Sequence, residues 1–437
     1  MPHIIGIRRE DKNRWERRVP LVPADLGRLA REDGLDFIVQ PSPIRTYKDE
    51  HFAGVGCRVE EDLSPAKVVF AVKEIPLDLL EPETAYVFFA HVIKGQAYNM
   101  PLLQRLLDLR CTLIDYERIA DAKGRRLVFF GREAGQAGMI ETFHALDRRL
   151  RWEGFDSPFQ GVKQAYAYSD LEHAKRELRE LGLSIRAGID PDLAPMVVGF
   201  AGYGNVSRGA QEIFDLFPHD EVEPGELAAL FSNKQPPRDR LYKVVFREED
   251  MVLPVDRDAD FDLQDYYANP EHYRGRFADY LPYLSALVNC IYWTERYPRL
   301  ISRADARSLW SAGRRNLRVV GDISCDIDGS IEFTTKATEP DRATFVYDPI
   351  SDGFKDGVEG RGIVDMAVDN LPCELPRDAS NTFSAALRGF VAQLARTDFD
   401  RPFAQLGLPP ELARAVVTHQ GALTPDYRYL EEFLGDD

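Results

Sequence analysis

Short apolar runs alternate with amphipathic segments along most of this chain, and the alternation restricts the folds it can adopt. The apolar runs have the length and the Val, Ile and Phe content of buried strands. The intervening segments repeat apolar residues at helical spacing. This alternation predicts an α/β fold with a parallel sheet covered by helices. The predicted strands are 3–7, 36–40, 67–74, 85–93, 111–117, 195–201, 243–246, 287–293, 318–324, 343–348 and 363–370.

Size and charge exclude several classes of partner. At 437 residues the chain is long enough for two or three domains of ~150 residues. Its net charge of −17 repels phosphate backbones, so no nucleic acid is expected as a partner. The longest mostly apolar run, 281–293, is shorter than the ~20 residues that cross a bilayer, so no membrane partner is expected. The start, MPHIIGIRRED, has no apolar signal segment, which predicts a cytoplasmic protein.

Neither the cysteines nor the histidines have the spacing of metal ligands. The five cysteines form no CxxC pair, and their odd number argues against a disulfide framework. The eight histidines show no HxxxH or HExxH pattern. We therefore predict no metal site.

A glycine-rich stretch opens the long amphipathic segment 131–154. The segment, GREAGQAGMIETFHALDRRLRWEG, has its glycines at the start and helical spacing afterwards. It predicts the crossover from one domain into the next. The glycines fit either a hinge or close packing of this helix on its surroundings.

The stretch GYGNVS, residues 202–207, joins a predicted strand to a predicted helix. Gly202 allows a tight turn, and Gly204 lets the backbone approach a pyrophosphate at the free N–H groups of the helix. Ser207 replaces the third glycine of the usual GxGxxG pattern and is still small. A plain tight turn is the alternative, but the strand–turn–helix context favours a dinucleotide site.

An acidic residue ~20 positions after the turn would bind the adenosine ribose. Asp220, Glu221 and Glu223 lie in that region, and Glu223, just past a short predicted strand, is our choice. A carboxylate there favours NAD. Arg208, in the first turn of the helix, could instead meet the 2′-phosphate of NADP.

Two neighbouring predicted strands each end by presenting a titratable group. Lys73 ends the run FAVKEIP and His91 ends the run FFAHVIKGQ. Loops at the carboxyl ends of parallel strands are where α/β proteins place reactive groups. A solvent-facing charge is the alternative for Lys73, and a polar cap in a hydrogen-bond network is the alternative for His91.

Several longer stretches resemble the lysine–ketoglutarate reductase family, the saccharopine dehydrogenases that form or release lysine, within the alanine dehydrogenase/transhydrogenase group. They follow one another in the family's order over most of the chain. The resemblance is carried by 7–23, 70–76, 88–96, 124–140, 202–214, 287–293, 321–333 and 357–380. The animal and plant members of the family continue into a second enzyme, so the resemblance implies a stand-alone reductase here.

The resemblance implies two Rossmann-like, doubly wound α/β domains with a cleft between them. The C-terminal segment would complete the first domain. The predicted catalytic domain is therefore 1–135 plus 375–437, and the predicted dinucleotide-binding domain is 136–374.

The implied reaction joins the ε-amine of lysine to the ketone of 2-oxoglutarate through an imine, which NAD(P)H reduces to saccharopine. Such chemistry needs groups that move protons near neutral pH, and Lys73 and His91 match positions that the family uses for this purpose. Lys73 is assigned as the base and His91 as the acid in the lysine-releasing direction, and the roles exchange in reduction. Neither the physiological direction nor the oligomeric state follows from the sequence.

The resemblance also implies contacts to the substrates and to the cofactor. Arginine suits the substrate carboxylates because its planar fork binds them in a bidentate manner. The implied substrate contacts are Arg18, Lys94, Gln96, Arg126 and Phe130. The implied cofactor contacts, beside Gly202, Gly204 and Glu223, are Arg125, Asn205, Val206, Asn289 and Asp322.

The choice of cofactor and of reaction keeps alternatives open. The chain resembles the animal and plant members more than the fungal ones, which implies NADP(H), whereas Glu223 disfavours a 2′-phosphate. NADP(H) is our choice, with NAD(H) as the alternative. An alanine dehydrogenase-like or other opine dehydrogenase is the second enzyme reading. A nucleotide-binding sensor without turnover is the third reading.

Overall fold

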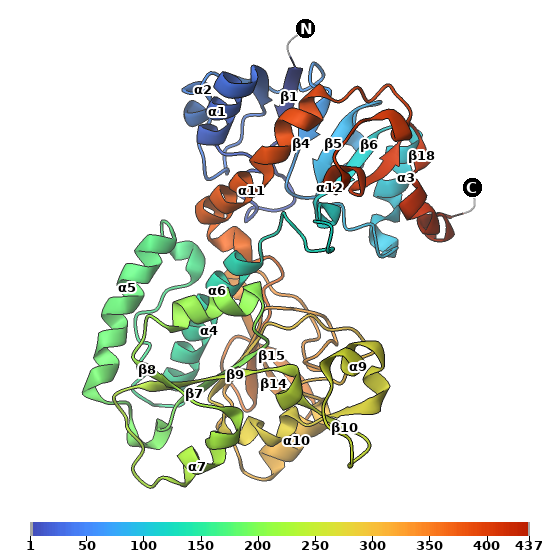
Figure 1. The fold of residues 1–437 in the computed structure, drawn as a ribbon. Helices are drawn as coiled ribbons and strands as arrows, with labels where there is room; N and C mark the ends of the chain where they lie inside the picture. Colours follow the sequence, from blue (N-terminus) through green and yellow to red (C-terminus); the bar gives the residue numbers. More distant parts are fainter. Residues whose placement is uncertain (1–2, 436–437) are drawn as a thin grey trace. The chain divides into compact units, whose positions relative to one another are not determined.

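The computed structural model describes residues 3–435, which form two compact units (Figure 1). Of the described residues, unit 1 comprises 3–130 together with 376–435, and unit 2 comprises 131–375. The boundaries that we expected lay at 135/136 and 374/375. Each unit contains its own eight-stranded sheet and its own hydrophobic core.

The sheet of unit 1 begins as a parallel sheet with the order β6-β5-β4-β1-β2-β3. Apart from the short edge strand β3, its strands are mostly buried, which explains their near-continuous apolar sequences. The strands are β1 (His3–Ile7), β2 (Leu35–Val39), β3 (Arg58–Val59), β4 (Val68–Phe70), β5 (Ala85–Phe88) and β6 (Thr112–Asp115). The helices of this half are α1 (Pro23–Asp33), α2 (Asp49–Ala53) and α3 (Met100–Asp108).

The C-terminal segment returns to unit 1 and extends its sheet. Helix α11 (Pro376–Arg396) packs on α1, with Ser384 donating to the buried Asp25 at 2.6 Å. After α12 (Pro410–Ala413), strand β17 (Val416–His419) pairs antiparallel with β6, and β18 (Ala422–Leu423) pairs antiparallel with β17. The last strand that the sequence analysis predicted is 363–370, so these two strands were not expected.

Unit 2 contains the sheet β15-β14-β16-β13-β12-β7-β9-β8, in which β14 runs antiparallel to both of its neighbours, β15 and β16, and the other pairs are parallel. Its main strands are β7 (Val197–Ala201), β8 (His219–Glu221), β9 (Leu241–Phe246), β12 (Ala286–Asn289), β13 (Val319–Asp322), β14 (Thr344–Asp348), β15 (Gly353–Asp356) and β16 (Ile363–Met366). A separate two-stranded sheet pairs β10 (Val252–Pro254) with β11 (Tyr273–Gly275). The helices are α4 (Gly131–Trp152), α5 (Leu171–Ser184), α6 (Asn205–Phe214), α7 (Leu227–Ser232), α8 (Glu248–Met251), α9 (Leu263–Ala268) and α10 (Arg303–Ser311).

The glycines at the start of α4 allow close packing. A Cβ on Gly135 would lie 1.9 Å from the carbonyl oxygen of Val206 in α6, and a Cβ on Gly209 would lie 2.1 Å from the carbonyl oxygen of Arg132. The two helices therefore cross with backbone against backbone, and α6, which follows the glycine turn, is held firmly in place. Of our two interpretations, these contacts support the packing role.

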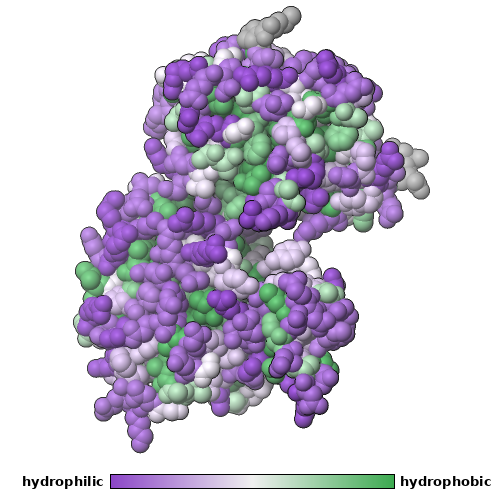
Figure 2. All heavy atoms as spheres, viewed as in Figure 1, coloured by the Kyte–Doolittle hydropathy of each residue, from purple (hydrophilic) through white to green (hydrophobic). Residues whose placement is uncertain are grey.

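On the face shown in Figure 2, polar and charged residues cover most of the surface, as the 29% charged content requires. Within residues 3–435, no helix combines the length and the apolar character needed to cross a bilayer.

Candidate active site

Each sheet has a switch point, where later strands add on the opposite side of the first strand. In unit 1, β2 and β4 flank β1, and in unit 2, β9 and β12 flank β7. Loops at the carboxyl ends of strands beside a switch point form the binding crevices of α/β folds. The candidate residues of unit 1 accordingly follow β1, β4 and β5, and those of unit 2 follow β7, β9 and β12.

Lys73 lies three residues beyond β4, in a loop that Glu10 holds in place. The two carboxylate oxygens of Glu10 accept the backbone N–H groups of Val72 and Lys73 at 2.7 and 2.9 Å. Glu10 is buried, and burial, followed by the nearby Glu16 carboxylate, raises its pKa to about 7. The loop after β1 thus fixes the backbone from which the Lys73 side chain extends.

The amine of Lys73 is tuned towards its neutral form. Burial lowers its pKa, and the positive charges of Arg18 and Lys12 lower it further. A lower pKa increases the fraction of neutral amine near neutral pH, and this is the form that accepts a proton.

His91 lies three residues beyond β5 and is oriented by a carboxylate. Its Nδ1 is 2.5 Å from Oε1 of Glu74, whose other oxygen lies 3.1 Å from Nζ of Lys12. Burial alone would raise the pKa of Glu74, but the hydrogen bond and charge of His91, with Lys12, lower it to about 2. An ionised Glu74 accepts the Nδ1 proton, which leaves Nε2 of His91 to exchange a proton with a ligand.

The backbone around His91 is also held in a specific conformation. His91 has a φ of 50°, which is uncommon for a residue other than glycine. The side chain of Asn99 donates to the carbonyl oxygens of Ala90 and His91, both at 3.1 Å. The imidazole ring is stacked on Phe89 with 6.2 Å between ring centroids. Such over-determined strain is typical of functional positions.

Arg18 is buried and already paired. Its Nε and Nη2 bind the two oxygens of Glu16 at 2.7 and 2.5 Å, and the side chains are 1% and 0% exposed. The guanidinium lies over the ring of Phe130, 4.3 Å from its centroid, and Phe130 stacks on Phe383. Arg18 is therefore part of the framework of unit 1 as well as a source of positive potential beside Lys73.

The other predicted site residues of unit 1 differ in their exposure and in the polar contacts that they already make. Arg126 is about half exposed and makes one long contact, 3.4 Å, with Glu117. Oε1 of Gln96 is buried and has no hydrogen-bond partner in the described part of the chain, so it is available to a donor on a ligand. Lys94 is exposed. Arg125 is largely exposed and pairs with Asp121 in its own turn at 2.7 Å.

Four charged residues of this cluster escaped the sequence analysis. They are Glu10, Lys12, Glu16 and Glu74. Glu74 follows Lys73 directly in VKE, and the other three lie in the charged stretch 7–18, which is the signal that could have found them. Across residues 3–435, no group of three or more His, Cys, Asp or Glu is placed to hold a metal ion.

In unit 2 the glycine turn has the geometry that a pyrophosphate requires. Gly202 has a φ of 92°, and a Cβ there would lie 3.1 Å from Cγ2 of Ile291. A Cβ on Gly204 would meet no atom within 4 Å, so the space above the turn is open. No side chain caps the N-terminus of α6, which starts with the exposed Asn205 and the half-buried Val206. These residues fit a bound dinucleotide.

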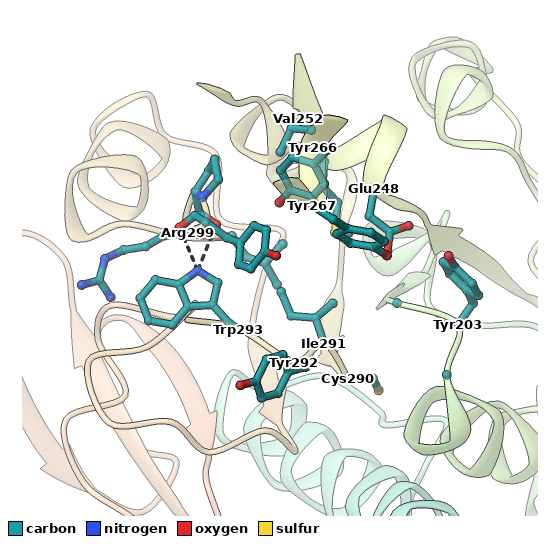
Figure 3. Close-up of a pocket in the computed structure, with 16 residues that line it drawn as sticks. Tyr203, Glu248, Val252, Tyr266, Tyr267, Cys290, Ile291, Tyr292, Trp293 and Arg299 are labelled. Carbon is teal, nitrogen blue, oxygen red and sulfur yellow. Dashed lines mark hydrogen bonds between the residues drawn. The ribbon is translucent and has the colours of Figure 1, made fainter. Parts of the chain in front are cut away.

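An aromatic pocket of about 490 Å³ opens beside the glycine turn (Figure 3). The turn forms one side of it, and the segments that follow β9 and β12 form the others. Its aromatic lining consists of Tyr203, Tyr266, Tyr267, Tyr292, Trp293 and Tyr297. The indole N–H of Trp293 donates to the carbonyl oxygens of Tyr297 and Pro298 at 3.1 Å, which fixes one wall. Planar aromatic walls suit a purine ring.

Asn289 and Asp322 end the adjacent strands β12 and β13 and are hydrogen-bonded at 2.8 Å. The hydroxyl of Thr334 lies 2.8 Å from Asp322 and 2.7 Å from Asp365, yet it has only one proton to donate. Burial and the Asp322 charge raise the pKa of Asp365 well above its usual range. Thr334 can donate to only one of the two carboxylates, and the raised pKa of Asp365 makes it the group that more readily holds the proton required by the other hydrogen bond.

Glu223 lies away from the glycine turn. It follows β8, the outermost strand of the sheet, and β9 lies between β8 and β7. Its side chain is exposed, and its backbone N–H donates to Glu226 at 2.9 Å. The structure brings the other cofactor candidates of unit 2 together at the carboxyl ends of β7, β12 and β13, but not Glu223.

Comparison with known proteins agrees with this arrangement. Residues 6–137 match the family described as alanine dehydrogenase/PNT, N-terminal domain. The chain is 40% identical to an alpha-aminoadipic semialdehyde synthase of Arabidopsis thaliana and 36% identical to the mitochondrial one of Bos taurus. These alignments cover 98% of this chain but only 41% and 48% of the relatives, so the chain spans about half their length.

A third relative is matched over nearly its full length. It is a saccharopine dehydrogenase [NAD(+), L-lysine-forming] of Emericella nidulans, 26% identical over 87% of this chain and 89% of the relative. Among solved structures, an L-alanine dehydrogenase aligns with a TM-score of 0.64 at 16% identity, covering 99% and 100% of the two chains. The transhydrogenase of Sinorhizobium meliloti aligns with a TM-score of 0.57 at 14% identity, covering 97% and 99%. The solved structures establish the α/β fold with two sheets.

Proposed function

The chain belongs to the lysine–ketoglutarate reductase/saccharopine dehydrogenase (lysine-forming) family of the alanine dehydrogenase/transhydrogenase group, and from this premise we propose that it interconverts saccharopine with lysine and 2-oxoglutarate. In the reductive direction the ε-amine of lysine adds to the ketone, water leaves, and the resulting imine is reduced. Lysine, 2-oxoglutarate and NAD(P)H with one proton give saccharopine, NAD(P)⁺ and water. The substrates are therefore small polar molecules with several carboxylates.

One observation carries this proposal: the proton-transfer groups of unit 1 occupy neighbouring loops and are prepared for their roles. Lys73 follows β4 and His91 follows β5, and β4 pairs with β5. Lys73 has a lowered pKa, and Glu74 leaves Nε2 of His91 free. Amine addition and loss of water each require a proton to be moved, so two such groups suit this reaction.

We assign the roles by direction. In the lysine-releasing direction, neutral Lys73 accepts the proton of the secondary amine as it is oxidised. His91, protonated at Nε2 and held by Glu74, then donates a proton to the departing amine. In the reductive direction His91 is the base and Lys73 the acid, as microscopic reversibility requires.

The substrate carboxylates need cationic side chains and hydrogen-bond donors near the loops that follow β4 and β5. Arg126 is half exposed and only loosely bound to Glu117, so it is our first candidate for a substrate carboxylate. The buried Arg18 contributes positive potential from the interior of unit 1, and the exposed Lys94 contributes it from the loop after β5. The free Oε1 of Gln96 would accept a hydrogen bond from a substrate ammonium group.

Unit 2 would bind the dinucleotide, which supplies the hydride when bound. The glycine turn and the N-terminus of α6 would hold the pyrophosphate. Asn289 and Asp322 end the next two strands of the sheet, and the position of Asp322 resembles one that the family places beside the nicotinamide. Its three donors, Thr334, Asn289 and the N–H of Cys325, keep this buried carboxylate satisfied. We propose NADP(H) as the preferred cofactor.

The decisive experiment follows nicotinamide absorbance after purified protein is mixed with lysine, 2-oxoglutarate and NADPH or NADH. Oxidation of the nicotinamide should require both substrates, and saccharopine should appear in equal amount by mass spectrometry. Controls with either substrate alone should give little change. Equal or faster oxidation with pyruvate and ammonia would replace the proposal with an alanine dehydrogenase. Binding of NADPH without turnover on any of these substrates would point to a sensor.

A further inference from the structure

The strand order of unit 2 determines which residue faces the adenosine ribose. In dinucleotide folds this position is at the end of the strand that pairs with the strand before the glycine turn. Here that strand is β9, because β9 pairs with β7 and β8 pairs only with β9. The backbone N–H of Gly202 donates to the carbonyl oxygen of Phe246, the last residue of β9, at 3.0 Å. The next residue is Arg247.

Arg247 has a free cationic side chain. It is exposed and forms no salt bridge with any carboxylate of residues 3–435. Its guanidinium lies over the ring of Tyr203, the middle residue of the glycine turn, 5.2 Å from the centroid. Its backbone N–H donates to Oδ2 of Asp250 at 2.8 Å, which fixes the start of α8. The side chain is thus placed beside the turn but has no ionic partner of its own.

The neighbouring carboxylate is already engaged. Glu248 lines the aromatic pocket, and its Oε1 accepts the hydroxyl proton of Tyr267 at 2.7 Å. Tyr203 lies on its other side, as Figure 3 shows, and burial and the Glu248 charge raise the pKa of Tyr203. An acidic residue that binds two ribose hydroxyl groups must offer both oxygens, whereas Oε1 of Glu248 already accepts the hydroxyl proton of Tyr267.

We propose that Arg247 binds the 2′-phosphate of NADP and makes this chain selective for NADP over NAD. The proposal rests on the dinucleotide function of unit 2 and adds the residue that discriminates. The planar guanidinium offers several donors to phosphate oxygens, and the Tyr203 ring supports it from one face. The adenine would then enter the aromatic pocket beside it.

Two other residues compete for this role and are less well placed. Glu223 is separated from the turn by the whole width of β9. Arg208 is exposed in the first turn of α6, but it lines a different hollow, together with Arg132, Gln211 and Glu212. Arg247, by contrast, contacts Tyr203, which belongs to the glycine turn and lines the pocket beside it.

Calorimetric titration of the full chain with NADPH, NADH, 2′,5′-ADP and 5′-AMP tests the proposal directly, without any substrate turnover. Charged hydrogen bonds to a phosphate are worth about 10- to 100-fold in affinity, so Arg247→Gln should raise the Kd of NADPH and 2′,5′-ADP by that factor. The Kd of NADH and 5′-AMP should stay within about twofold. Arg247→Lys should recover part of the loss, because it restores the charge but not the fork.

Arg208→Gln is the matched control. It should change none of the four affinities by as much as the 10- to 100-fold expected for Arg247→Gln. Circular dichroism and thermal melting confirm that each variant is folded. If Arg247→Gln weakens NADPH and NADH equally, or weakens neither, Arg247 does not read the 2′-phosphate. A selective loss in Arg208→Gln alone also overturns the proposal. Wild-type protein that binds neither dinucleotide would overturn the proposed function as well, which separates the two failures.

Discussion

The first strand of each unit lies inside its sheet, and later strands add on both sides of it, yet the two units place different chemistry at this shared position. In unit 1 the loops beside β1 and β4 present Lys12, Glu74 and Lys73, which interact through charge. In unit 2 the loop after β7 presents two glycines and a tyrosine, and the pocket beside it is lined mainly by aromatic rings. One sheet plan therefore supports a proton-transfer site in one unit and a flat nucleotide surface in the other.

The difference shows how each unit balances its buried polar groups. Unit 1 sets carboxylates against nitrogen groups, so that Glu16 forms an ion pair with Arg18 and Glu74 is hydrogen-bonded to Nδ1 of His91. Unit 2 instead raises the pKa of Asp365 and links this residue through Thr334 to Asp322. Removal of one partner from a buried ion pair leaves an uncompensated charge. Removal of a member of the hydrogen-bonded network in unit 2 leaves a buried polar group without its hydrogen bond. Variants in the two units should therefore fail in different ways.

The largest effect is expected for Lys73→Met in unit 1. Removal of a general acid–base group typically lowers kcat by ~10²–10⁴-fold, and one limb of the pH–rate profile should disappear. The Kd of NADPH should not change, because the dinucleotide residues belong to unit 2. Steady-state kinetics across pH, together with calorimetry, measure both quantities.

Lys67→Met is the matched control for this variant. Lys67 is exposed and precedes β4, whereas Lys73 follows it. The control should leave kcat within about twofold, since surface substitutions away from a site have small effects. If Lys73→Met changes KM alone and both pH limbs persist, Lys73 is only a charge near the substrates.

Arg18→Ala should come next, with its main effect on folding. The substitution removes the Arg18 side of the buried Glu16–Arg18 ion pair, which costs about 3–5 kcal/mol of the free energy of unfolding. Urea unfolding followed by fluorescence should show the lower midpoint. Arg126→Ala is the control: it should change stability by no more than about 0.5 kcal/mol while raising KM for the substrates. Equal stability of the two variants would show that the Glu16–Arg18 pair contributes little.

The sequence was sufficient to predict much of the fold. The apolar runs placed the main strands of both sheets, because buried parallel strands need continuous apolar sequence. The strands β17 and β18 were missed because they are short and lie near the chain's end, and only pairing with β6 makes them strands. Strand order was not readable either, since many orders bury the same residues. Without the strand order, we chose Glu223, which follows β8, as the residue beside the glycine turn. In the structure β9, not β8, is the strand next to β7.

For the candidate site, too, the sequence predicts some features and not others. Lys73 and His91 could be placed in adjacent loops from the sequence, because successive parallel strands are often neighbours. The partners that set their protonation could not, because Lys12 and Glu74 meet across 62 residues of chain. Likewise, a sequence pattern does not reveal that Arg18 is occupied by Glu16, two residues away. Those contacts depend on side-chain directions that only the folded chain defines.

Gly204→Val tests unit 2 and should have a smaller effect than the unit 1 variants. The open space above Gly204 means that the valine fits the folded protein and projects towards the pyrophosphate. The Kd of NADPH should rise by about tenfold or more, with an unchanged melting temperature. Gly225→Val is a control, because a Cβ there also meets no atom within 4 Å but lies after β8. Unchanged NADPH affinity in Gly204→Val would remove the dinucleotide from this turn.

The last comparison concerns a pH dependence and two aspartates that end strands of the two sheets, Asp115 on β6 and Asp322 on β13. Burial, and then the Glu117 charge, raise the pKa of Asp115 to about 8. Burial also raises the pKa of Asp322, but its hydrogen-bond donors limit the rise to about 6. Asp115 thus binds a proton in the folded state that the unfolded chain releases near its usual pKa of ~3.9.

The sign of the pH effect follows from this difference. The stability that Asp115 contributes is complete below pH ~4 and is lost as the pH rises through about 8. Asp115→Asn removes this pH-dependent loss. The free energy of unfolding of the variant should therefore rise relative to that of the wild type by up to ~1.4 kcal/mol per pH unit in that interval. Thermal melting of both proteins between pH 5 and about 7.5 measures the gain, and parallel curves would show that Asp115 stays charged when folded. For Asp322→Asn the relative rise in the free energy of unfolding should span a narrower pH range, because the pKa of Asp322 in the folded state is closer to its value in the unfolded chain.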